Sequence, residues 1–180
     1  MRISFNAPFT LVFTVLATIV YLIFVQNNLY SEIFILQGRA KIDDWQWYAG
    51  TIFYTLGHAD FNHLAGNFMF ILLLGPIVEN HYGTKKLILM VLITAFLTSV
   101  IHVFFWNHNI IGASGIVFML IILSALIPSK GKEIPLTFIL IILLYIGKEI
   151  LESFSQDNIS HFAHISGGIL GALLGVKAKI

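Results

Sequence analysis

The sequence predicts an all-α membrane protein, a bundle of six transmembrane helices, from its composition and from the spacing of its charges. The chain of 180 residues is 58% hydrophobic and only 11% charged, whereas soluble domains carry about 25% charged residues. Long stretches, among them 3–31 and 87–129, contain no Asp, Glu, Lys or Arg. A helix of about 20 mainly apolar residues is enough to cross about 30 Å of hydrocarbon.

The predicted helices follow one another along the chain, separated by polar or helix-terminating residues. We expect them at about 8–26, 62–80, 85–106, 114–128, 134–151 and 161–176. The first connection, 27–61, mixes charged and aromatic side chains, a composition that suits the membrane interface. No polar block is long enough to fold separately, so residues 1–180 are expected to form a single membrane domain.

Basic residues are divided unequally between the two ends of this bundle. Seven belong to the end that carries both termini, and three belong to the opposite end. The positive-inside rule therefore predicts that both termini are cytoplasmic. A net charge of +1 without a basic stripe argues against nucleic acid as a partner. The absence of cysteine excludes disulfides and thiolate nucleophiles.

Polar side chains inside the predicted spans are the first functional candidates, because ionisable groups there are costly and usually serve a function. At 1.5 Å per helical residue, Asn67, Ser114 and His164 share a depth of about 20–22 Å from the cytoplasmic ends of their helices. His63 lies about one turn higher on the same helix face as Asn67. Three different helices therefore present polar groups at one level.

The fourth predicted span is too short to cross the membrane core alone, since 114–127 covers only about 21 Å. Residues 107–113 must then enter the membrane as non-helical backbone, which is tolerated only where protein buries it or water reaches it. Ser114 would begin a submerged helix, where the dipole and free N–H groups favour an oxyanion. This is a suitable place for a nucleophile.

Acyl transfer is the chemistry that these residues allow. A serine needs an adjacent base, and His164 lies at the matching depth and titrates near neutral pH. Phe118, four residues after Ser114, could hold the imidazole by ring packing. No carboxylate is expected at a comparable depth, because Asp60 and Asp157 belong to outer loops and Glu79 to the cytoplasmic end. We therefore expect a dyad rather than a triad.

Two further features support this arrangement. The tetrahedral intermediate needs hydrogen-bond donors, which the Ser114 backbone N–H, the Asn67 amide and His63 could supply. Small residues at four-residue spacing allow close packing of membrane helices. The sixth predicted helix carries Gly167, Gly171 and Gly175, and the fourth carries Gly115 beside Ser114. These two helices could therefore pack closely against one another.

These residues resemble the motifs of the rhomboid family of intramembrane serine proteases. Residues 112–115, Gly-Ala-Ser-Gly, look like its Gly-x-Ser-Gly motif, and 63–67 look like its His-x-x-x-Asn motif. Residues 163–167, followed by Gly171, look like its Ala-His-x-x-Gly signature. The similarity covers about 58–175, and the chain is similar to the minimal six-helix bacterial form with an interfacial first loop.

The resemblance implies an endopeptidase that cleaves the transmembrane helices of membrane-protein substrates near their outer end. It places the chain in a bacterial inner membrane and implies no cofactor and no metal. Ser114 would be the nucleophile, His164 the base, and Gly112 would shape the loop beside the serine. His63, Asn67 and the Ser114 amide would form the oxyanion hole. The first loop departs from the family because it lacks the arginine of a frequent Trp-Arg pair.

Two alternatives remain open at this point. A non-catalytic relative that binds membrane clients would share the fold, although such proteins usually lose the serine or the histidine. A metal site could use His58, His63 and His164, but no intramembrane carboxylate supports it. Apart from these alternatives, the histidines outside the candidate site are expected to be structural: His58, His81, His102, His108 and His161.

Overall fold

The computed structural model describes residues 5–25, 32–128, 133–152 and 161–178, and most of these residues are helical. The longer helices are α1 (Pro8–Val20), α3 (Phe61–Tyr82), α4 (Thr84–Phe105), α5 (Ser114–Leu126) and α8 (His161–Lys177). A π-helical turn, η1 (Tyr21–Val25), continues α1, and a second one, η4 (Ile142–Ile146), joins α6 (Leu136–Ile141) to α7 (Gly147–Glu152). These bounds lie within a few residues of the predicted spans.

The connection between α1 and α3 contains short helices rather than an extended loop. They are η2 (Glu32–Phe34), α2 (Trp45–Phe53) and η3 (Tyr54–Leu56). Trp45 is 70% exposed and Tyr48 is 52% exposed, so α2 presents aromatic rings on its outer face. An amphipathic ring placed in this way can keep one edge in water and the other in lipid.

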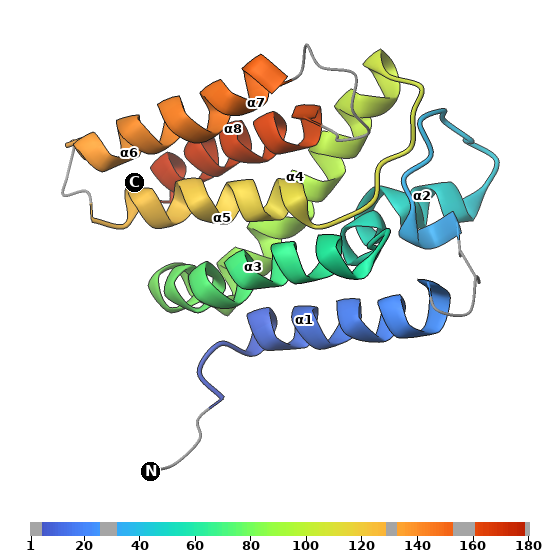
Figure 1. Cartoon of the computed structure of the whole chain (residues 1–180), viewed down its shortest axis with the longest axis horizontal. Helices are drawn as coiled ribbons and strands as arrows, with labels where there is room; N and C mark the ends of the chain where they lie inside the picture. The colour runs from blue at the N-terminus through green and yellow to red at the C-terminus, as the bar shows by residue number, and fades with distance from the viewer. Residues whose placement is uncertain (1–4, 26–31, 129–132, 153–160, 179–180) are drawn as a thin grey trace.

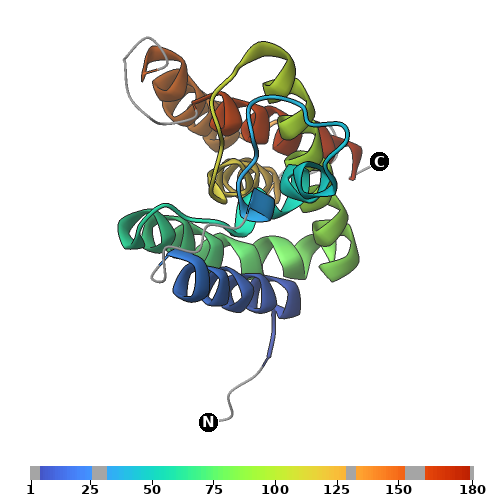
Figure 2. The ribbon, with the colours of Figure 1, turned by 90° about the vertical axis from the view of Figure 1, so that its right-hand side faces the viewer.

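Helix α5 lies at the centre of the bundle. Every residue from Gly115 to Leu123 is buried, and the helix is apolar on all its faces, as expected for a helix surrounded by others. It packs against α3, α4, α6 and, most extensively, α8. Figures 1 and 2 show α5 between α3 on one side and α8 with α6 on the other. Anything placed at the start of α5 is therefore enclosed by the bundle.

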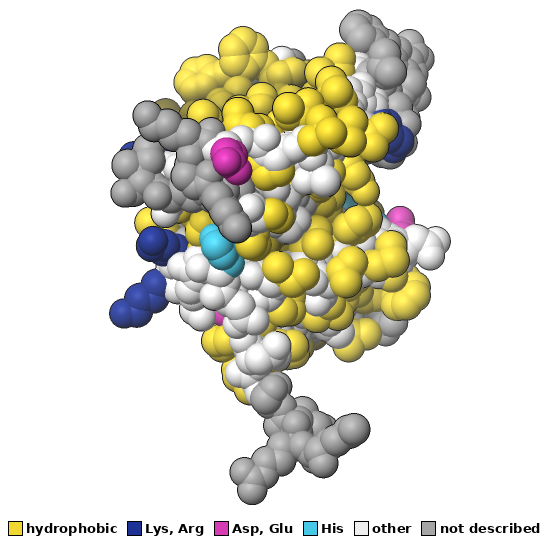
Figure 3. Space-filling view, turned by 90° about the vertical axis from the view of Figure 1, so that its left-hand side faces the viewer, with side chains coloured by type: hydrophobic (Ala, Val, Ile, Leu, Met, Phe, Trp, Pro, Cys, Tyr) yellow, Lys and Arg dark blue, Asp and Glu magenta, His cyan; other side chains and the backbone are white. Residues whose placement is uncertain are grey.

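The outer helices expose apolar side chains instead of charged ones. Val15 of α1, Leu73 of α3, Phe104 of α4 and Leu173 of α8 are each more than half exposed. Figure 3 shows that yellow apolar side chains cover much of the surface at one end of the bundle. Within the described residues, two helices are long and apolar enough to cross a membrane by themselves, α3 and α4. The exposed apolar faces are typical of contact with lipid.

The turn between α3 and α4 is very short. Only Gly83 separates α3 from α4, and its φ of 84° lies in the left-handed region that favours glycine. A substitution there would strain the backbone and change the angle between the two helices.

Glu79 joins the beginning of α1 to the end of α3. Its carboxylate accepts hydrogen bonds from the Phe9 and Thr10 backbone N–H groups, at 2.9 and 3.0 Å, and from the Thr10 and Thr84 hydroxyls, both at 2.8 Å. The side chain is only 2% exposed. A negative charge at a helix N-terminus also interacts favourably with the dipole of α1. The carboxylate of Glu79 near the end of α3 thus has a structural role: it anchors α1.

We expect Glu79→Ala to lower the free energy of unfolding by about 3 kcal/mol, because four donors lose a charged acceptor and two of them belong to a buried residue. Thermal unfolding in detergent micelles measures this. Glu133→Ala is the matched control, since Glu133 is exposed. An equal effect of the two substitutions would contradict the anchoring role of Glu79.

Candidate active site

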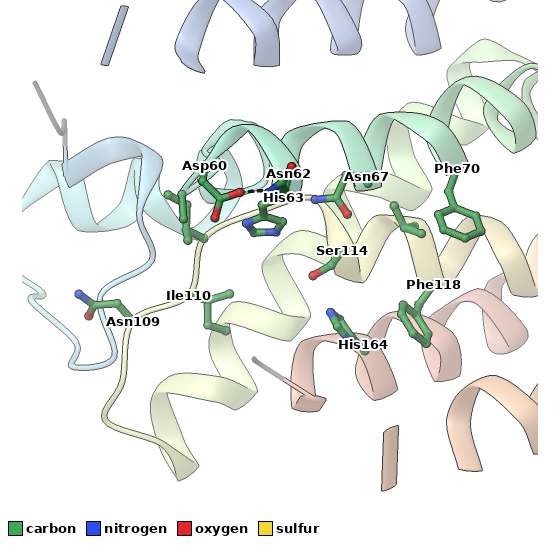
Figure 4. A pocket seen from close by; sticks show the side chains of 14 residues that line it. Asp60, Asn62, His63, Asn67, Phe70, Asn109, Ile110, Ser114, Phe118 and His164 are labelled. Atoms are coloured by element: carbon green, nitrogen blue, oxygen red, sulfur yellow. Dashed lines mark hydrogen bonds between the residues drawn. The ribbon is translucent and has the colours of Figure 1, made fainter. Parts of the chain in front are cut away.

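A cavity of about 580 Å³ opens where α3, α5 and α8 begin. Polar side chains from all three helices line it together with apolar ones, as Figure 4 shows. The sequence-predicted residues His63, Asn67, Ser114, Phe118 and His164 are all in its lining. The lining also includes Ala59, Asp60, Asn62, Gly66, Phe70, Asn109, Ile110, Ile111 and Val117.

Ser114 is the first residue of α5 and lies at the cavity wall. The N-cap residue, Ala113, makes no side-chain hydrogen bond to the helix, and the first backbone bond of the helix runs from the Val117 N–H to the Ala113 carbonyl at 3.0 Å. The earlier N–H groups of a helix have no partner within it. The Ser114 hydroxyl thus lies at the positive end of the dipole of α5.

The non-helical segment before α5 is fixed by the first connection. Leu36 and Ile110 exchange two backbone hydrogen bonds of 2.9 Å, and the Gly38 N–H donates to the Asn109 side-chain oxygen at 3.1 Å. The Gly112 N–H donates to the Tyr54 carbonyl at 3.0 Å. These bonds satisfy backbone groups that could not remain unpaired inside the protein. They also set the position of the residues just before Ser114.

Gly112 is required both by its backbone conformation and by its neighbour. Its φ is 115°, in the left-handed region. A Cβ atom at this position would come within 2.5 Å of Cε1 and Nε2 of His63. The loop therefore packs directly on the His63 ring, and a larger residue would displace either the loop or the ring.

His164 lies in the first turn of α8 and stacks on Phe118. The ring centroids are 4.6 Å apart and the planes differ by 8°. In the view of Figure 4 the His164 ring lies below Ser114, with the Phe118 ring beside it on the right. The ring packing expected from the four-residue spacing is present, and it limits rotation of the imidazole beside the serine.

Glycines allow α5 and α8 to touch through their backbones. A Cβ atom on Gly167 would overlap the Gly115 carbonyl oxygen, and one on Gly115 would lie 3.0 Å from the Ala163 carbonyl oxygen. One turn further, a Cβ atom on Gly171 would lie 2.9 Å from the Met119 carbonyl oxygen. Residues 115 and 163 are the chain neighbours of Ser114 and His164, so this contact brings the two side chains to one cavity.

The Asn67 side chain is 6% exposed, and its amide nitrogen has no hydrogen-bond partner among the described residues. A buried amide without an acceptor is unusual, because leaving it unpaired costs about 1–3 kcal/mol. It borders the cavity on the same helix as His63. An acceptor that enters the cavity would find this donor already desolvated.

Asp60 lies closer to the site than the sequence indicated. It is the N-cap of α3, where its carboxylate accepts a hydrogen bond from the His63 N–H at 2.8 Å, and it lines the cavity. The sequence predicts Asp60 in an outer loop, and the structure places it at the end of that loop, directly before α3, where it reaches the rim of the cavity. The Asp-x-x-His spacing is an N-cap pattern that could have revealed this. Glu79 lies at the other end of α3, and Asp157 lies outside the described residues.

His58, which the sequence analysis expected to be structural, lies directly against His63. Its side chain is fully buried, and its ring packs edge-on against His63 with centroids 5.1 Å apart. Burial lowers the pKa of His58 to about 4, so the ring stays neutral at physiological pH. Because His58 precedes α3, no helical periodicity in the sequence relates it to His63. Within the described residues, no group of three or more His, Cys, Asp or Glu is placed to hold a metal ion.

Comparison with known proteins identifies the family. The model of the rhomboid domain matches residues 44–179, and the chain therefore belongs to the rhomboid family. Rhomboid-like protein 11, chloroplastic, of Arabidopsis thaliana is 27% identical over 136 residues, which are 67% of this chain and 49% of that protein. RHOMBOID-like protein 4 of the same plant is 32% identical over 126 residues, 66% of this chain and 31% of that protein. The chain thus matches half or less of the length of these curated relatives.

Proteins of this family are membrane proteins, and the apolar helices of the present chain agree with that assignment.

Proposed function

We propose that this protein is an intramembrane serine endopeptidase that cleaves transmembrane helices of other membrane proteins near their outer end. The observation that carries the proposal is the joint placement of Ser114 and His164 in one cavity, with the His164 ring stacked on Phe118. A serine beside an oriented imidazole at a helix N-terminus is suited to acyl transfer. Membership of the rhomboid family, which contains serine proteases, supports it.

In this mechanism His164 accepts the Ser114 hydroxyl proton while the oxygen attacks the carbonyl carbon of the scissile peptide. The Asn67 amide, His63 and the Ser114 backbone N–H donate hydrogen bonds to the resulting oxyanion. His164 then gives the proton to the leaving amine, and the peptide C–N bond breaks to leave an acyl ester on Ser114. A water molecule, deprotonated by His164, hydrolyses the ester and restores the serine.

The bilayer would enclose this site. We propose that α1 with η1, α3, α4, α5, the run from α6 to α7, and α8 form six spans of one membrane domain, with α2 at the interface. The exposed apolar faces of the outer helices support it, as does the central position of the short helix α5. The polar side chains in the cavity lining would then admit the water that hydrolysis consumes.

Ser114→Ala and His164→Ala should each abolish cleavage of a model single-span substrate, because the nucleophile and the base act as one unit. A serine-reactive fluorophosphonate should label the unsubstituted protein and should not label Ser114→Ala. Ser124→Ala is a matched control, since Ser124 lies on the same helix and its hydroxyl bonds to the Ile121 carbonyl at 2.8 Å.

Proteolysis that persists in purified Ser114→Ala would overturn the serine mechanism. Absence of both labelling and cleavage in the unsubstituted protein, combined with retention of single-span proteins on it, would favour the non-catalytic alternative.

Asn67→Ala should lower turnover by about 10²–10³-fold, the range for losing one oxyanion donor. The loss should fall on kcat rather than KM, because the negative oxygen exists only in the transition state. Asn62→Ala is the control: Asn62 also lines the cavity on α3, but it is exposed. Equal losses in the two variants, or a loss confined to KM, would remove Asn67 from the oxyanion hole.

We also propose that the protein lies in a bacterial inner membrane with both termini in the cytoplasm, as the division of basic residues indicates. A reporter that is active only in the cytoplasm, fused after Ile180, should be active, and one fused within 37–43 should be silent. The reverse pattern would invert the proposed orientation of the cavity.

A further inference from the structure

The cavity has an uneven distribution of charge and polarity along its length. Among the 14 lining residues, Asp60 is the only Asp, Glu, Lys or Arg. Figure 4 shows Asp60 and Asn62 toward one end and the rings of Phe70 and Phe118 toward the other, with Ser114 between them. A chain that crosses Ser114 would therefore meet a carboxylate on one side and an apolar wall on the other.

The Asp60 charge is fixed in place. One carboxylate oxygen accepts the His63 N–H at 2.8 Å as the cap of α3, which holds the side chain at the rim. Within the described residues, no Lys or Arg forms an ion pair with it. Because the carboxylate is exposed and no described Lys or Arg pairs with it, it remains available to a charged group of a ligand.

We infer that Asp60 determines part of the substrate specificity: it selects membrane segments that carry Lys or Arg on one side of the scissile bond and apolar residues on the other. This inference rests on the proposed proteolytic function. The physical basis is attraction of a cationic side chain to the rim carboxylate and repulsion of Asp or Glu. The apolar end would accept the hydrophobic part of the same segment.

The expected size of this substrate preference follows from the strength of exposed ion pairs. One such pair changes an equilibrium by less than about tenfold, and exchanging Lys for Asp in the substrate combines an attraction with a repulsion. We therefore expect kcat/KM to favour Lys over Asp by about fivefold at the best position. Salt should weaken the preference, because the Debye length falls to about 3 Å at 1 M.

The test uses a set of single-span substrates in which Lys, Gln or Asp occupies each of the four positions on either side of the cleavage site. Asp60→Asn removes the charge but keeps a side chain that caps helices equally well. The Lys-to-Asp ratio of kcat/KM should fall to about one in this variant. Asp44→Asn is the matched control: Asp44 caps α2 through the Gln46 N–H at 2.9 Å and does not line the cavity.

A ratio that is unchanged in Asp60→Asn, or that changes equally in Asp44→Asn, would overturn the inference while leaving the protease assignment intact. A binding measurement tests the role of Asp60 independently of the proteolytic function. Ser114→Ala should bind the Lys peptide more tightly than the Asp peptide, and adding Asp60→Asn should remove that difference. If the difference in binding is present but no substrate is cleaved, the proposed function fails and only the preference of Asp60 for cationic ligands stands.

Discussion

The site depends on how closely the backbones of α5 and α8 approach one another at the level where both helices begin. Gly167 sits against the Gly115 carbonyl with no room for a Cβ atom, and Gly171 repeats the contact one turn further against Met119. A methyl group between the helices would separate them, and the side chains next to the contact would separate with them. In a lipid environment this contact gains little from the hydrophobic effect, so close packing and small residues must provide the association. The glycines are therefore part of the geometry of Ser114 and His164.

The second requirement is a cavity that brings a few polar side chains together inside an apolar bundle. Non-helical backbone before α5 is stable there because the first connection supplies its hydrogen bonds, through Leu36, Gly38 and Tyr54. The same connection thereby holds the start of α5, where the N-cap residue Ala113 makes no side-chain hydrogen bond to the helix and Ser114 lines the cavity. The Asn67 amide lacks a partner among the described residues although it is almost fully buried. Under the proposed mechanism, this desolvated donor would be available to the oxyanion, an acceptor that forms only during the reaction.

The end of α3 that lies away from the cavity is anchored by Glu79. The Glu79 carboxylate ties α1 and the start of α4 to the end of α3 through hydrogen bonds of 2.8–3.0 Å. Helix α3 is thus held at one end by Glu79 and capped at the other by Asp60. Since His63 and Asn67 both belong to α3, their positions relative to Ser114 depend on contacts made at both ends of the helix.

The sequence by itself determined the helices and the level of the site, because both follow from local rules. Apolar run lengths gave the helix bounds to within a few residues, and the rise per residue placed Asn67, Ser114 and His164 at one depth. The stacking of Phe118 on His164 could also be predicted from the spacing, once the two helices were assumed to touch.

Only the tertiary structure decided which loops border the cavity. Asp60 at the rim and His58 against His63 lie before α3, where no helical period links one residue to the next, so their places depend on how the first connection folds back onto the bundle. The same holds for the bonds from Leu36 and Tyr54 to the segment before Ser114: they join residues far apart in the chain, and their geometry exists only after the helices have packed.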